Sequence, residues 1–162
     1  MVPHTLLPPR MGAALALAVA LTAGCSDAVG PGTTLAENRA KWLALGVSDY
    51  GFVFHRLCFC EPAALEPVRI RVSQGAVVAV YDSLGQAIDS LGVALHFTVT
   101  IDSLFDVVDR AIAMGVARLD VRYHPSFGYP QHIGIDYLSD AVDDEIDLEA
   151  DSLVLFRGDT RR

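Results

Sequence analysis

The chain has 162 residues, of which 52% are hydrophobic and 20% are charged, and its formal net charge is −8. This length favours one compact domain, and the hydrophobic share excludes a wholly disordered chain. The excess of acidic residues excludes the usual electrostatic mode of nucleic-acid binding, because nothing would offset phosphate repulsion. No stretch reaches the ~18 consecutive apolar residues that a membrane-spanning helix needs.

The first 25 residues have the pattern of an export signal. Arg10 precedes an apolar run at 11–23, which has the length of a signal peptide and is too short for a stable span. Residues 21–25, LTAGC, resemble the lipobox of bacterial lipoproteins. The resemblance implies cleavage before Cys25 and acylation of its thiol, so that lipid chains hold the protein on a membrane. A plain secretory signal cut near Ala23 is the alternative.

This pattern divides the chain into four parts. They are a lipoprotein signal peptide at 1–24, a flexible tether at 25–33, a single α+β domain at 34–157 and a tail at 158–162. Removing the first 24 residues takes away Arg10, the single charged side chain there, and leaves 138 residues with a net charge of −9. We therefore expect a membrane-anchored domain in the cell envelope, on the extracytoplasmic side.

The mature chain begins with a helix that is followed by three strands. Thr34 and Glu37 have the spacing of a capping box, and apolar residues with helical spacing follow them. Aromatic and β-branched residues then predict strands, two of which are joined by Gln74-Gly75. The order is a helix at 35–45, strands at 50–60, 68–73 and 76–81, and an irregular loop at 82–97.

The second half repeats this order. Thr100 is a candidate N-cap, Asp102 suits the positive end of a helix dipole, and Gly115 closes the apolar helical stripe. After Gly115 the alternation of apolar and polar residues has period two. The order is a helix at 101–114 and strands at 117–124, 132–137 and 146–149, the last leading into 153–156.

The predicted fold class is α+β, with two helices packed on an antiparallel sheet. The order of elements also suggests a doubled α-β-β-β layout. It is similar to the tandem helix-plus-three-strand modules of small exported inhibitors and propeptides, a likeness at the level of the fold alone.

An ordered set of residues runs through about 40–150. Its members are Trp42, Tyr50, Phe52, Cys58-Phe59-Cys60, residues 100–105, Tyr123, residues 127–130 and Ile135-Asp136. This set resembles a bacterial lipoprotein family that is defined only as a domain of unknown function. His124 departs from the pattern, in which an Asp would fit better. The resemblance implies an envelope location and a compact domain, and it implies no activity.

Cys58 and Cys60 are the sharpest chemical feature of the sequence. With Cys25 acylated they are the two remaining cysteines, and an exported chain meets oxidising conditions. We expect a small structural disulfide, which requires the strand to end or bulge there, because residues two apart in a strand lie ~6.6 Å apart. The alternative is a redox-active or metal-binding pair, although His55 points to the opposite face of the strand from Cys58.

His124 and His132 flank a turn of the predicted hairpin, with Asp120 and Asp136 on the same strand faces. Two imidazoles and carboxylates match the ligands of zinc or copper, so both histidines are metal candidates. A solvent-facing polar stripe on a half-buried hairpin is the preferred interpretation. We expect no cofactor.

The expected partner-binding surface combines an aromatic turn with an acidic segment. Phe127 and Tyr129 suit an exposed contact point in the turn. Residues 136–151 contain eight acids and no base, and include Asp143, Asp144 and Glu145. Such a run suggests calcium or a basic partner, but it lacks the spacing of an EF-hand loop. A solvated loop and strand face is the simpler interpretation.

The sequence contains no Gly-x-Ser-x-Gly elbow, no His-Glu-x-x-His, and no phosphate-binding or nucleotide-binding glycine motif. We therefore expect a lipid-anchored lipoprotein with a non-catalytic binding domain, whose partners are the membrane and another envelope protein. The alternative is an envelope metal-binding or thiol-redox protein that uses the Cys-x-Cys pair. An unrecognised hydrolase ranks third.

Overall fold

The computed structural model describes residues 31–59, 65–89 and 98–156. These residues form two helices and six strands, and neither helix is long and apolar enough to cross a membrane. The helices are α1 (Pro31–Ala44) and α3 (Ile101–Met114). The strands are β1 (Tyr50–Cys58), β2 (Val68–Ser73), β3 (Ala76–Tyr81), β4 (Arg118–Tyr123), β5 (Pro130–Asp136) and β6 (Ile146–Leu155).

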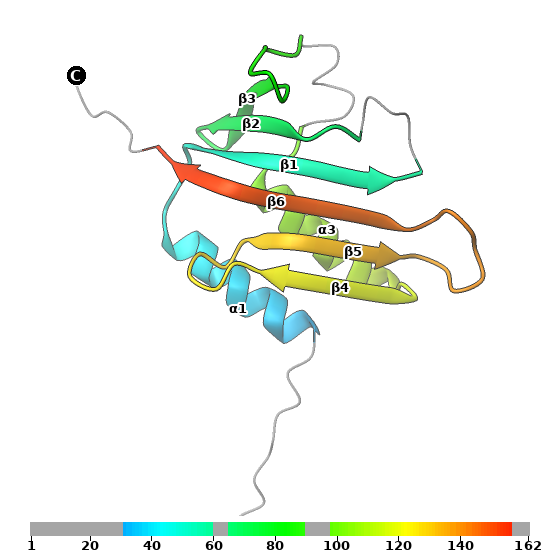
Figure 1. The fold of residues 1–162 in the computed structure, drawn as a ribbon. Coiled ribbons are helices and arrows are strands. Elements are labelled where there is room, and N and C mark those ends of the chain that lie inside the picture. The colour runs from blue at the N-terminus through cyan, green and yellow to red at the C-terminus, as the bar shows by residue number, and fades with distance from the viewer. Residues whose placement is uncertain (1–30, 60–64, 90–97, 157–162) are drawn as a thin grey trace, which may run out of the picture.

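The strands form one antiparallel sheet in the order β3-β2-β1-β6-β5-β4. The first and last strands of the domain therefore pair in the middle, and β3 and β4 are the two edges. Figure 1 shows the sheet with both helices against it. The predicted α+β class with an antiparallel sheet is confirmed.

The described elements follow the order helix, three strands, helix, three strands. The two halves nevertheless cross the sheet in different directions. The first meander runs from the centre to the β3 edge, whereas the second runs from the β4 edge back to the centre. A doubled α-β-β-β layout therefore stays a prediction that the sheet order does not test.

Helix α3 begins and ends where its sequence predicts. The Thr100 hydroxyl accepts from Ser103 N–H, and the Ser103 hydroxyl oxygen accepts from Thr100 N–H, which closes a capping box. Gly115 has a φ of 64°, in the left-handed region that favours glycine, and ends the helix. The buried stripe of α3 is Ile101, Leu104, Phe105, Val108 and Ala111.

Helix α1 begins at Pro31, upstream of the predicted start at residue 35. Proline is favoured in the first helical turn because its φ is already helical and its missing N–H would have no partner there. Thr34 therefore lies inside the helix and is not its N-cap, and the last three residues assigned to the tether are helical. The rest of the predicted tether, the signal peptide, the last residue of the predicted domain at 157 and the tail at 158–162 lie outside the described residues.

The core lies between the helices and one face of the sheet. Alternate residues of the strands point into it, as period-two burial requires. On β2, for example, Val68, Ile70 and Val72 are buried and the arginines between them are exposed. Six aromatic residues of the core are at most 2% exposed. They are Trp42, Tyr50, Phe52, Phe54, Phe105 and Tyr129.

Tyr50 joins β1 to both helices. Its ring meets Trp42 of α1 edge-on, with ring centroids 5.3 Å apart. Its hydroxyl accepts a hydrogen bond of 3.0 Å from the backbone N–H of Ile101 in the first turn of α3. That N–H has no partner within the helix, so the phenol satisfies a buried donor. Burial raises the pKa of Tyr50 to about 12.

We expect Tyr50→Phe to lower the free energy of unfolding by ~1–3 kcal/mol at neutral pH, because Ile101 N–H then stays buried without an acceptor. In the variant, the free energy of unfolding should also depend less on pH in the alkaline range. With a raised pKa in the folded state, Tyr50 contributes stability that is present below the unfolded value of ~10 and is lost as pH rises towards 12. Urea denaturation followed by circular dichroism from pH 7 to 11 measures both effects.

Tyr137→Phe is the matched control, because Tyr137 is 36% exposed and its hydroxyl has no hydrogen bond within the described residues. It should change stability by less than ~0.5 kcal/mol. Equal stabilities for the two variants at neutral pH would contradict the role assigned to the Tyr50 hydroxyl.

Candidate functional site

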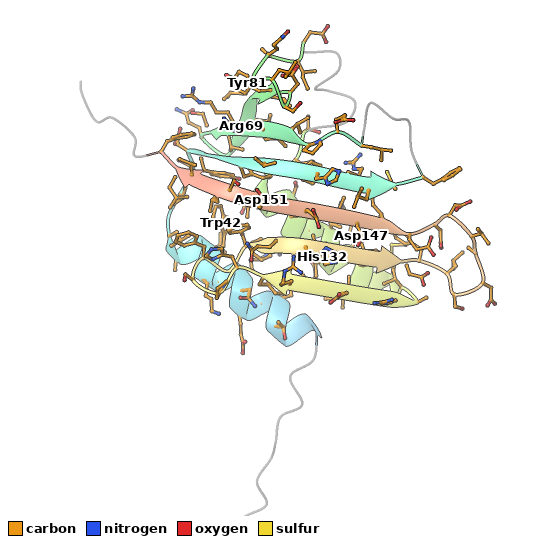
Figure 2. The ribbon with its side chains drawn as sticks, viewed as in Figure 1. Trp42, Arg69, Tyr81, His132, Asp147 and Asp151 are labelled. Atoms are coloured by element: carbon orange, nitrogen blue, oxygen red, sulfur yellow. The ribbon has the colours of Figure 1, made fainter. Side chains whose placement is uncertain are left out.

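The sheet face opposite the core is the candidate functional surface. Among the described residues, no helix or strand lies over it (Figures 1 and 2). Because residues directly opposite one another in antiparallel strands point to the same side, the register groups its side chains into cross-strand rows. Three such rows are Tyr81–Arg69–Val53–Asp151, His55–Glu149–His132–Arg122 and Leu57–Asp147–Gly134–Asp120.

The charges on this open face differ from strand to strand. The central strand β6 contributes only acids to it over 147–151, namely Asp147, Glu149 and Asp151. We call these three residues the acidic row. Arginines lie on β2, at 69 and 71, and on β4, at 118 and 122, where Asp120 lies between them. Figure 2 shows Asp147, Asp151 and Arg69 on this side of the sheet.

Two histidines flank the acidic row, one on each neighbouring strand. His55 Nδ1 lies 3.7 Å from a carboxylate oxygen of Glu149, and His132 Nε2 lies 3.6 Å from one of Asp147. His55 Nε2 is 2.8 Å from the carbonyl oxygen of Leu65, so a neutral ring donates there and leaves Nδ1 unprotonated towards Glu149.

Gly134 opens a small hollow of about 210 Å³ in this face. A Cβ at this position would lie 3.0 Å from Asp147 Oδ1 and 3.2 Å from His132 Nε2, so a side chain here would press on both groups. The hollow is lined by Arg118, Asp120, His132, Gly134, Ile135, Asp136, Glu145, Ile146 and Asp147. Within the ranges that the structure describes, no three His, Cys, Asp or Glu side chains are arranged to hold a metal ion.

His124 shapes the turn before β5 and does not meet His132. Its Nδ1 accepts from the backbone N–H groups of Ser126 and Phe127 at 3.2 and 3.1 Å. Its ring stacks on Phe127 and Tyr129, with centroids 4.7 and 5.1 Å away. On the sheet His132 is opposite Arg122, whereas His124 lies beyond the last pair of the β4–β5 ladder. His124 and His132 are therefore not cross-strand neighbours.

The aromatic turn is packed inside the molecule. Tyr129 is only 2% exposed and lies edge-on to Trp42, with centroids 6.3 Å apart, and Phe127 is partly buried against the core. Gly128 has a φ of 77°, and a Cβ there would overlap the carbonyl oxygen of Asn38 in α1. The expectation of an exposed contact point at Phe127 and Tyr129 is corrected, because the turn packs on α1.

The three acids of the predicted partner surface have separate environments. Asp143 is exposed and has a φ of 70°. Asp144 accepts a hydrogen bond of 2.8 Å from the backbone N–H of Leu138 and so closes the β5–β6 loop. Glu145 lines the hollow at Gly134. Only Glu145 therefore joins the open face.

The predicted cysteine chemistry stays a prediction. Cys58 is the last residue of β1, opposite Ile146 of β6. Its proposed partner Cys60 lies outside the described residues, as does the proposed lipidation site Cys25.

Sequence reasoning missed the rows themselves. The period-two pattern places Asp147 and Glu149 on one face of a strand, and His55 and Arg69 on one face of theirs. It does not say that β1 pairs with β6, and this pairing brings His55 to Glu149.

Residues 34–155 match a family of unknown function, DUF6174. The chain belongs to this family. No curated protein and no solved structure matches it. The matched DUF6174 span reaches from the first turns of α1 to the end of β6 and thus includes α3 and every described strand.

The residues on which the resemblance in sequence rests are mostly core residues of the DUF6174 domain. Trp42, Tyr50, Phe52, Tyr129 and Ile135 are each at most 3% exposed. Packing is therefore a sufficient physical reason for their presence, and they indicate a fold rather than a reaction.

We expect Gly128→Ala to destabilise the domain by ~2–5 kcal/mol, because Ala disfavours the left-handed conformation and its Cβ overlaps α1. Gly115→Ala is the matched control. Its φ is 64°, but nothing lies within 4 Å of the added Cβ, so the cost should be ~1 kcal/mol. Thermal and urea unfolding compare the two variants. Similar losses would show that the turn does not depend on close contact with α1.

Proposed function

We propose that this protein is a lipid-anchored bacterial lipoprotein of the cell envelope, whose extracytoplasmic domain binds a protein partner without catalysis. The anchor is supported by the apolar run at 11–23 and the segment LTAGC at 21–25. Helix α1 begins at Pro31, six residues after Cys25. Even fully extended, that segment spans only about 20 Å, so an acylated Cys25 holds the domain close to the membrane surface.

The acidic row is the observation that carries the binding function. Its three carboxylates repeat every second residue, about 7 Å apart, along the central strand of an uncovered sheet face. The arginines of β2 and β4 border the row and repel a broad cationic surface. This pattern complements a narrow basic segment, with alternate Lys or Arg side chains in extended form, on another envelope protein.

The anchor has a direct test in the mass of the protein recovered from bacterial membranes. The wild-type chain should begin at Cys25 and carry diacylglycerol, whereas Cys25→Ser should be unacylated and leave the membrane fraction. The same spectrum, with and without reductant, reports whether Cys58 and Cys60 have lost two hydrogens to a disulfide. An unprocessed, unlipidated wild-type N-terminus would overturn the lipoprotein proposal.

The partner class is tested with an extended peptide of alternating Lys and Thr. Replacing the acidic row by Asp147→Asn, Glu149→Gln and Asp151→Asn should weaken binding about tenfold, since three partly exposed ion pairs are worth ~0.5 kcal/mol each. Affinity of the wild type should fall as salt rises. Fluorescence anisotropy measures both effects.

The control removes three acids elsewhere by Glu37→Gln, Glu66→Gln and Asp109→Asn, all at exposed positions off the open face. This control variant loses three negative charges, as many as the acidic-row variant, and should alter binding of the peptide less than about twofold. Equal weakening by both triple variants would mean that net charge alone attracts the peptide, and the acidic row would lose its role.

A further inference from the structure

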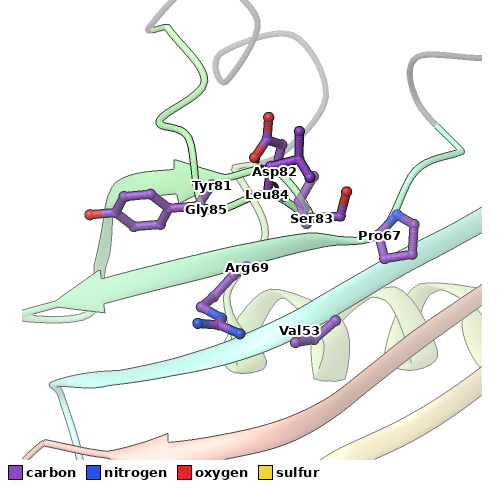
Figure 3. A pocket seen from close by; sticks show the side chains of 9 residues that line it. Val53, Pro67, Arg69, Tyr81, Asp82, Ser83, Leu84 and Gly85 are labelled. Atoms are coloured by element: carbon purple, nitrogen blue, oxygen red, sulfur yellow. Dashed lines mark hydrogen bonds between the residues drawn. The ribbon is translucent and has the colours of Figure 1, made fainter.

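A second hollow of about 570 Å³ lies on the open face near the β3 edge, and one of its lining residues, Val53, is directly opposite Asp151 of the acidic row. Its volume falls within the range of small-molecule sites. Figure 3 shows its walls, with Val53 and Arg69 on the sheet, Pro67 at one end and the turn after β3 on the other side. The lining residues are Val53, Pro67, Val68, Arg69, Tyr81, Asp82, Ser83, Leu84 and Gly85.

Arg69 supplies a cation with no ionic partner among the described residues. Its cross-strand neighbours, Val53 and Tyr81, are uncharged. The other charged group of the lining, Asp82, accepts hydrogen bonds of 2.9 and 2.8 Å from the backbone N–H groups of Leu84 and Gln86. Figure 3 shows the Asp82 carboxylate turned away from the Arg69 guanidinium. Within the part of the chain that the structure describes, the donors of Arg69 therefore have no acceptor and can pair with a ligand.

The turn gives the hollow a fixed apolar wall. Besides the two bonds to the Asp82 carboxylate, Gly85 N–H donates to the Asp82 carbonyl oxygen at 3.0 Å. These bonds fix the backbone at Leu84, whose side chain is 80% exposed. An apolar side chain exposed to water costs free energy that contact with a bound apolar group would recover. Val53 and Pro67 extend this apolar surface towards Arg69.

We propose that this hollow binds a small amphipathic carboxylate. The carboxylate pairs with the Arg69 guanidinium, whose planar fork matches two carboxylate oxygens. The apolar body lies against Val53, Pro67 and Leu84. The proposal is independent of the acidic row and of its basic partner, because no acidic-row residue lines this hollow.

Octanoate is the probe, titrated into the full chain carrying Cys25→Ser and followed by amide NMR shifts. We expect saturable shifts at Arg69, Ser83 and Leu84 with a Kd on the order of 1 mM or below, as the size of octanoate implies. Octanol, which has no charge, and acetate, which has no apolar body, should each bind at least about tenfold more weakly.

Arg69→Gln should weaken octanoate binding about tenfold, and Leu84→Ser should weaken it about threefold. Arg71→Gln is the matched control on the same strand and face, where the guanidinium lies over the Phe156 ring at 5.4 Å. It should leave the Kd within about twofold. All three positions are exposed, so unfolding midpoints should stay close to that of the parent chain.

Several results would overturn the proposal. They are the absence of saturable shifts around the hollow, equal affinities for octanoate and octanol, and an equal effect of Arg69→Gln and Arg71→Gln. Binding of inorganic phosphate as tight as that of octanoate would likewise reject it, because it would leave a simple anion site with no role for Leu84.

Discussion

The packing of Trp42 between Tyr50 and Tyr129 fixes which side of the sheet becomes the core. Trp42 meets both phenol rings edge-on, and the Tyr50 hydroxyl accepts from the first turn of α3. Helix α1, strand β1, helix α3 and the turn before β5 therefore meet at one cluster. A slip of β1 by one residue would turn Tyr50 to the open face and break all of these contacts. The side to which each acid and arginine of the sheet points depends on the same register.

That register creates the candidate site from residues distant in sequence. His55 and Glu149 are neighbours because the first and last strands of the domain pair at the sheet centre. Arginines then fall on β2 and β4, each of which is two strands away from the acidic row. The open face thus has an acidic centre, a basic border on β2 and a border on β4 where two arginines flank Asp120. Because the acids lie in a row along β6, a narrow basic segment can align with that strand. The net charge of the protein alone would attract such a segment without orienting it.

Local patterns predicted the parts of the fold that local physics decides. The Thr100 cap, the apolar stripe of α3 and the left-handed Gly115 were all evident in the sequence, because each depends on residues within a few positions. The burial of Tyr129 was not evident in the sequence, because it depends on contact with Trp42, which is remote in the chain. His124 illustrates the same limit. Its polar side chain suggested a metal ligand, but its Nδ1 is engaged by two N–H groups of its own turn.

Most of the residues that carry the resemblance in sequence lie in the core, on the opposite face of the sheet from the candidate site. Membership of DUF6174 is shown by the match over residues 34–155, and the core residues of that span constrain the fold without specifying a ligand. Function has to be argued from the open face. There the anchor proposal has a geometric consequence, because α1, which follows the tether, lies by the β4 edge in Figure 1, whereas the Arg69 hollow is near the β3 edge. A short tether at Cys25 would hold α1 near the membrane and leave the hollow at the far edge accessible to soluble carboxylates.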